Sequence, residues 1–83
     1  MKATRTTKMI DGCNEPIIVV SSDDDFVRVE IQKCYHYIGD DTLYMREYID
    51  GEFNAEEEFT GDFDMLLDSD AKRLAKEFSV YLN

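Results

Sequence analysis

One stretch of the chain has residue types and spacing that suit half of a calcium-binding loop. The segment YIDGEFNAEEEF, residues 48–59, places a glycine after an aspartate and then an aromatic residue and three glutamates. When Gly51 is aligned with the turn glycine of a twelve-residue EF-hand loop, Asp50 and Glu57 fall on the fifth and twelfth positions. The first position, where a carboxylate is required, is Arg46, and the third is a tyrosine. A guanidinium would repel a cation, so we expect no calcium site.

The same stretch is better explained by a hairpin turn. Asp-Gly is favoured in two-residue hairpin loops because both residues adopt positive φ at low cost, so we expect a turn at Asp50-Gly51. Beyond it, Asn54 and Glu57 have the spacing of a capping box, which predicts a short helix through Phe59.

Other chemistry has less support in the sequence. Cys34 and His36 lie two residues apart on an expected strand, and with Cys13 they would give three zinc ligands, but they lack a fourth ligand and the usual spacing. We expect a core cysteine and a surface or half-buried histidine. With one histidine in the chain, no Ser/His/Asp constellation suggests nucleophilic catalysis. The prediction is a protein that is not an enzyme and needs no metal or cofactor.

Negative charge is the strongest feature of the composition, and it is local. The net charge is -10, and residues 40–70 contain twelve acids and one base, Arg46. Direct binding to nucleic acid or to an anionic membrane requires clustered Lys and Arg, so neither is expected. Such a charge density costs self-repulsion that solubility does not require, which favours a cationic partner. A surface that serves solubility alone remains the alternative.

The first half of the chain has the patterns of β-strands. Strands are expected over residues 4–10, 16–22, 26–38 and 42–49, with turns at Asp11-Gly12, Asp23–Asp25 and Gly39–Asp41. In the third strand, Val27, Val29, Ile31 and Lys33 alternate with Phe26, Arg28, Glu30 and Gln32, which predicts one buried and one solvated face. The expected product is an antiparallel meander of about four strands.

The last part of the chain has helical periodicity. Apolar residues recur every three or four positions in the order Phe63, Leu67, Ala71, Leu74, Phe78, Leu82. One long helix or two short ones would satisfy this pattern, because Ser69 is able to restart a helix. A sheet packed by this amphipathic C-terminal segment is an α+β fold, and 83 residues suit a single domain, residues 1–83.

Cysteine usage and hydropathy suggest a compartment. Two distant cysteines do not form a disulfide framework, so we expect both thiols to be free. The N-terminal residues lack the apolar core of a signal peptide, and no window reaches the length of a membrane helix. A cytoplasmic protein is expected, which would be the host cytosol for a phage-encoded chain.

The acidic segment GDDTLYMREYIDGEFNAEEEFTGDFDMLLDSD, residues 39–70, resembles in composition the small phage-encoded inhibitors that imitate DNA, the antirestriction and anti-CRISPR proteins. This resemblance implies a non-enzymatic inhibitor whose carboxylates replace phosphates in the groove of a basic nucleic-acid-handling protein or nuclease complex. Electrostatic steering would speed the association. The residues expected to contact the partner are Asp40, Asp41, Glu47, Asp50, Glu52, Glu56, Glu57, Glu58, Asp62 and Asp64.

A second hypothesis is a protein–protein adaptor or antitoxin-like module that binds through an exposed sheet edge. Charge mimicry weakens steeply as ionic strength rises, whereas an edge-strand interface does not. The sequence does not predict the oligomeric state.

Overall fold

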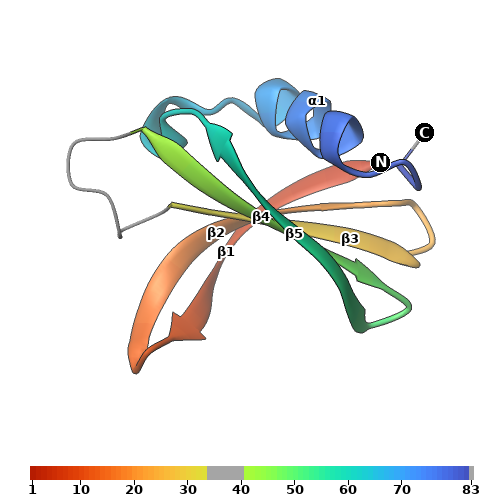
Figure 1. Ribbon diagram of the computed structural model, residues 1–83, viewed down its shortest axis with the longest axis horizontal. Helices are drawn as coiled ribbons and strands as arrows, with labels where there is room; N and C mark the ends of the chain where they lie inside the picture. Colours follow the sequence, from red (N-terminus) through yellow and green to blue (C-terminus); the bar gives the residue numbers. More distant parts are fainter. Residues whose placement is uncertain (34–40, 83) are drawn as a thin grey trace.

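The computed structural model describes residues 1–33 and 41–82 and contains one five-stranded antiparallel sheet with helical segments on one face (Figure 1). Neighbouring strands follow chain order, β1-β2-β3-β4-β5, so the predicted meander and α+β class are confirmed, with five strands instead of about four. The strands are β1 (Lys2–Ile10), β2 (Cys13–Ser21), β3 (Val27–Lys33), β4 (Thr42–Ile49) and β5 (Glu52–Thr60).

Two of the hairpins turn on the predicted Asp-Gly pairs. Asp50 and Gly51 have φ of 50° and 79°, and they join the paired residues Ile49 and Glu52. Asp11 and Gly12 repeat this geometry between β1 and β2, with φ of 50° and 83°. Positive φ at both central residues matches the right-handed twist of the flanking strands, which fixes the register of each hairpin.

The short helix predicted from Asn54 to Phe59 is wrong, because these residues belong to strand β5. The strand pairs with β4 along its whole length, from Ile49–Glu52 to Thr42–Thr60. The register shifts at Glu47/Tyr48, so β5 carries one extra residue there, which is a β-bulge. Pairing with β4 and an apolar contact of Phe59 with the core outweigh the low strand propensity of consecutive glutamates.

The predicted turn at Asp23–Asp25 is confirmed as the connection between β2 and β3. Asp24 accepts hydrogen bonds from the Ser22 hydroxyl at 2.6 Å and from the Phe26 amide at 3.1 Å, and these contacts lower the pKa of its carboxyl. The N-terminal ammonium hydrogen-bonds to Asp23 and lowers the pKa of that carboxyl. The turn predicted at Gly39–Asp41 lies outside the described residues, except for Asp41.

The predicted helical stripe divides into two short segments. A single turn of 3₁₀ helix, η1 (Phe63–Met65), is followed by two extended residues and then by α1 (Asp68–Phe78). Leu67, expected within the stripe, precedes the helix and is 66% exposed, whereas Phe63 is buried. The Asp70 carboxylate accepts a hydrogen bond from the Leu67 amide at 3.0 Å, which stabilises the first turn of α1.

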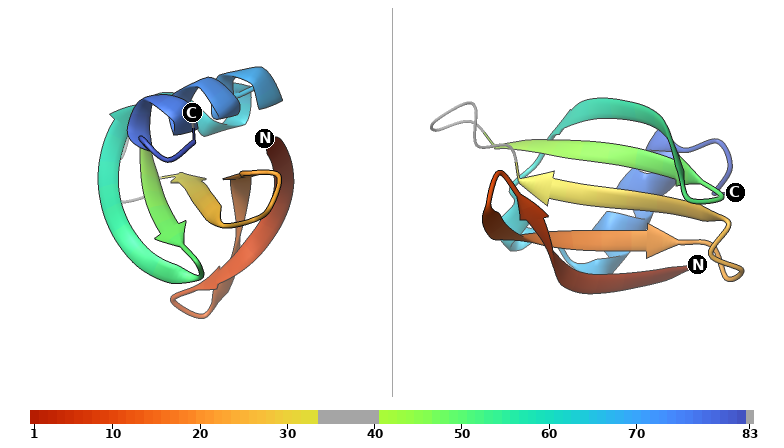
Figure 2. Two further views of the ribbon diagram at one scale, coloured as in Figure 1. Left: turned by 90° about the vertical axis from the view of Figure 1, so that its right-hand side faces the viewer. Right: turned by 90° about the horizontal axis from the view of Figure 1, so that it is seen from below.

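The core lies between α1 and one face of the sheet. We call this the helix face; it is formed by Ile18, Val20, Val27, Val29, Ile31, Leu43 and Met45, against Phe63, Ala71, Leu74, Ala75 and Leu82. The opposite, open face includes Lys8, Glu30, Arg46 and Tyr48. The predicted alternation in β3 is confirmed on its buried side, while Glu30 on the other side is only 8% exposed. Figure 2 shows a strongly twisted sheet with α1 lying across it.

No helix in residues 1–33 and 41–82 is long and apolar enough to cross a membrane.

Candidate partner-binding surface

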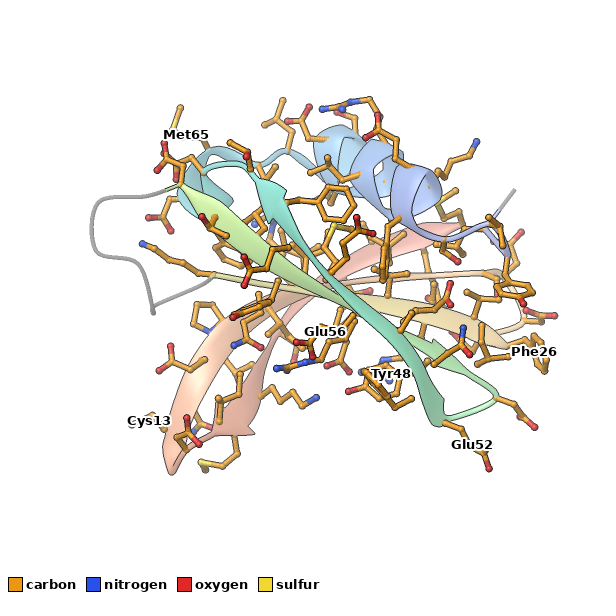
Figure 3. The ribbon with its side chains drawn as sticks, in the orientation of Figure 1. Cys13, Phe26, Tyr48, Glu52, Glu56 and Met65 are labelled. Carbon is orange, nitrogen blue, oxygen red and sulfur yellow. The ribbon has the colours of Figure 1, made fainter. Side chains whose placement is uncertain are left out.

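Strand β5 gathers four of the predicted contact residues on one edge of the sheet. Its nine residues contain four glutamates and no base, and within residues 1–33 and 41–82 it pairs with β4 alone. We call Glu52, Glu56, Glu57 and Glu58 the acidic edge; all four are exposed. Figure 3 shows Glu56 near the middle of the strand and Glu52 beside the β4–β5 turn.

The glutamates of the acidic edge point to both faces of the sheet. Glu56 and Glu58 pair with Arg46 and Tyr44 on the open face, while Glu57 pairs with Met45 on the helix face. Because side chains alternate between the two faces of a strand, Glu56 and Glu58 are about 6.8 Å apart along β5 on the open face, and Glu57 lies between them on the helix face. The three consecutive carboxylates therefore form a ridge of negative charge along both sides of the edge strand.

One member of the acidic edge is partly neutralised within the chain. Glu56 accepts a hydrogen bond at 2.9 Å from Nε of Arg46, which lies directly opposite on β4. Arg46 also donates to the Gln32 amide oxygen at 3.1 Å. In residues 1–33 and 41–82, Glu52, Glu57 and Glu58 have no cationic group within 4.0 Å. These three carboxylates carry the uncompensated charge of the edge.

Glu47 must be removed from the predicted surface set, because its side chain is buried, with 4% exposure. It points to the helix face, where it accepts hydrogen bonds from the Asn54 amide at 2.6 Å and from the Ser79 hydroxyl. Asn54 is the extra residue of the β5 bulge, and Ser79 follows α1 and is 1% exposed. Glu47 is thus an internal contact that joins β4, β5 and the C-terminal segment.

The remaining predicted acids lie at both ends of the hairpin formed by β4 and β5. Asp50 is beside Glu52 at one end, while Asp41, Asp62 and Asp64 are at the other, where the Gly61 amide donates to the Asp41 carbonyl at 2.7 Å. Asp64 lies 3.4 Å from Nζ of Lys33, and Asp62 accepts from the Asp64 amide at 3.1 Å. Asp40 lies outside the described residues. Because these groups are spread along the edge, the predicted acids form a band instead of one flat face.

The open face is close to neutral, because acids and bases alternate on it. Lys8 Nζ lies 2.7 Å from Glu30, and Arg28 lies 3.5 Å from the same carboxylate. The twist also brings Lys8 within 3.3 Å of the Tyr48 hydroxyl, although β2 and β3 lie between their strands. The hydrogen bond with Glu30 raises the pKa of Lys8 despite its partial burial. Lys8 and Arg28 therefore compensate Glu30 on this face, whereas Glu58, which points to the same face from β5, has no ion pair among the described residues.

Three exposed aromatic residues were not among the contact residues predicted from the sequence. Phe26 is 48% exposed, and Phe53 and Tyr81 are each 58% exposed. Each of them lies beside turn residues, where an apolar side chain has no obvious partner to pack against, and this position could have identified them. All three line one groove, which is treated below.

The metal sites considered from the sequence have no structural counterpart in the described residues. Residues 1–33 and 41–82 contain no group of three or more His, Cys, Asp or Glu side chains suited to hold a metal ion. Cys13 is a free, exposed thiol, and the other two zinc candidates, Cys34 and His36, lie outside the described residues. Asp50 and Gly51 form the predicted tight turn.

No protein-family model, curated protein or solved structure matches this chain.

Proposed function

We propose that this protein is a non-enzymatic inhibitor or modulator that binds a basic nucleic-acid-handling protein and occupies its phosphate-binding groove. This is the mode of action of the phage-encoded antirestriction and anti-CRISPR proteins that the acidic segment resembles. The observation that supports it most is the acidic edge, a ridge of four exposed glutamates on an edge strand without a base. A projecting strand enters a groove more readily than a flat sheet face does.

The charge pattern supports an electrostatic contact with a cationic partner. Glu52, Glu57 and Glu58 would each gain a Lys or Arg partner without first breaking an ion pair among the described residues. Close charge pairs that are desolvated in a protein interface couple by about 1.5–7 kcal/mol each, whereas exposed pairs contribute about 0.2–1 kcal/mol. Three desolvated pairs at the lower value would supply about 4.5 kcal/mol, roughly a third of the 12 kcal/mol that corresponds to a nanomolar affinity.

Displacement of proteins from immobilised DNA tests this proposal. A bacterial extract is bound to DNA-cellulose at low salt, and the column is eluted with the wild-type protein. We expect at least one nucleic-acid-binding protein to elute. The variant Glu52→Gln/Glu57→Gln/Glu58→Gln keeps side-chain size and removes three charges, and it should require at least about 100-fold more protein for the same elution.

A matched control separates the acidic edge from net charge. Glu15→Gln/Asp68→Asn/Glu77→Gln changes the net charge by the same amount on β2 and α1. It should elute the same proteins at the wild-type concentration. The proposal is contradicted if the wild-type protein displaces nothing, or if both variants lose displacement equally.

The exposed position of β5 also favours a second function, the adaptor that adds a strand to its edge. Along nine residues, the side of β5 away from β4 has no strand partner in the described part of the chain. Strand addition uses backbone hydrogen bonds, which salt weakens little. A partner that remains bound at 1 M salt and is not displaced by DNA would favour the adaptor.

A further inference from the structure

A groove with aromatic walls lies at the end of the sheet where the β2–β3 and β4–β5 turns meet the C-terminal segment. It has a volume of about 470 Å³, which is within the range of sites that bind small ligands or peptide side chains. It is lined by Phe26, Ile49, Asp50, Glu52, Phe53, Asn54 and Tyr81. Figure 3 shows Phe26 and Glu52 at this same end of the molecule.

The groove walls are held in place by hydrogen bonds and by one aromatic contact. The Asp50 amide donates to the Phe26 carbonyl at 2.8 Å, which fixes the two turns side by side. Phe53 packs edge to face on Tyr48, with ring centroids 6.0 Å apart. Tyr81 donates its amide to Ser79 Oγ at 3.3 Å, and Ser79 is bound to the buried Glu47. The aromatic side chains are thus exposed on a supported backbone.

The residues that line the groove favour a ligand that is a cation with a flat apolar surface. Three exposed aromatic side chains line it, and Asp50 and Glu52 add two carboxylates that have no ion pair within residues 1–33 and 41–82. No Lys or Arg lines the groove; Lys76 belongs to a separate hollow that also contains Tyr81. A guanidinium stacks on aromatic rings and forms paired hydrogen bonds with carboxylates, which a compact ammonium does less well.

Other occupants are disfavoured by charge. Nucleic acids and anionic membranes would meet two carboxylates at the groove, and a second copy of a chain with net charge -10 would be repelled. We propose that this groove binds an arginine side chain of a cationic protein segment. This goes beyond the proposed function, because it assigns an adjoining contact site, which shares Glu52 with the acidic edge, its own ligand chemistry.

The inference is tested with Nα-acetyl-arginine amide as the probe and the citrulline analogue as a neutral control of the same shape. In ¹H–¹⁵N NMR titrations, we expect shifts at Phe26, Asp50, Gly51, Phe53 and Tyr81, with a dissociation constant on the order of 1 mM. Citrulline should bind about tenfold more weakly or not at all, because it lacks the charge-assisted hydrogen bonds.

Variants of the groove distinguish a specific site from general attraction. Asp50→Asn/Glu52→Gln removes both carboxylates, and Asn tolerates the positive φ of residue 50, so the fold is kept and the shifts should disappear. Phe53→Ser removes one aromatic side chain and should reduce the size of the chemical-shift changes caused by the arginine probe. The control Glu57→Gln/Glu58→Gln makes the same charge change outside the groove and should bind like the wild type.

Three results would overturn the inference. Equal binding of citrulline would exclude a guanidinium site, and shifts that map only to the acidic edge would show non-specific attraction. Groove resonances that shift with protein concentration alone would identify a second copy as the occupant. The titration needs no nucleic-acid-binding protein, so its failure and the failure of the proposed function are distinguishable.

Discussion

The buried contact between Glu47 and Ser79 leads to a prediction that is independent of any partner. Ser79 is 1% exposed, and its hydroxyl donates to the Glu47 carboxylate. Glu47→Ala would leave this hydroxyl buried without its acceptor, which costs about 1–3 kcal/mol. The other donor, Asn54, is exposed and can bind water instead, so its loss adds little. We expect a total cost of about 1–3 kcal/mol, or a fall in Tm of about 5–20 °C for a domain of this size.

The double variant Glu47→Ala/Ser79→Ala gives the sharper result. Ser79→Ala alone would leave the carboxylate without one charge-assisted hydrogen bond, at a cost of about 1.5–3 kcal/mol. When both partners are removed, neither the hydroxyl nor the carboxylate is left without the other, so the double variant should be more stable than the sum of the single effects predicts. The loss of the Tyr81 amide's acceptor occurs in both Ser79→Ala and the double variant and cancels from the coupling free energy. The coupling free energy should be about 1.5–3 kcal/mol.

Urea unfolding followed by circular dichroism measures these free energies. The slope against urea concentration should remain that of the wild type, because the surface exposed on unfolding changes little. Asn54→Ala is the control for the exposed partner and should cost less than about 1 kcal/mol. Additivity of the two single substitutions within about 0.5 kcal/mol would refute the reasoning, because uncoupled residues behave in that way.

Two further predictions concern the sheet. Because Glu30 raises the pKa of Lys8, their contact stabilises the fold below the ordinary Lys pKa of 10.5 and is lost as the pH rises through the higher folded value. Tm should therefore fall more steeply above pH 10.5 in the wild type than in Lys8→Met, and superimposable alkaline limbs would contradict this. A Cβ at Gly61 would lie 2.8 Å from Cδ1 of the fully buried Leu43, so Gly61→Ala should cost about 1–3 kcal/mol in urea unfolding. When Gly61→Ala is combined with Leu43→Ala, the double variant should lose less free energy of unfolding than the sum of the two single losses. Full additivity would show that the two side chains do not clash.

The sequence predicted the features that depend on local rules. Asp50-Gly51 formed a hairpin because both residues reach positive φ without strain, and Val27, Val29 and Ile31 reached the core because strand side chains alternate. The apolar stripe from Phe63 onward placed helical structure correctly, but the exposed Leu67 interrupts it with extended backbone.

The features that depend on pairing between distant residues were not predicted. Residues 54–59 were interpreted as a short helix because Asn54 and Glu57 have the spacing of a capping box. The bulge at Asn54 then places Phe53 and Phe59 on opposite faces, although their even separation would put them on the same face of a regular strand. The hairpin at Asp50-Gly51 was itself a signal that a partner strand should follow. Glu47 was assigned to the surface because its hydrogen-bond partner, Ser79, is 32 residues away in the chain.

Competition with DNA tests the central hypothesis most directly. A protein displaced from DNA-cellulose is titrated with fluorescent duplex DNA at increasing concentrations of this chain, and anisotropy reports the bound fraction. If the acidic edge occupies the phosphate-binding groove, the apparent Kd for DNA will rise linearly with the concentration of this chain and will not reach a plateau. With the variant Glu52→Gln/Glu57→Gln/Glu58→Gln, the same concentrations will raise the apparent Kd far less. A plateau, which indicates a ternary complex with DNA still bound, would contradict the proposal.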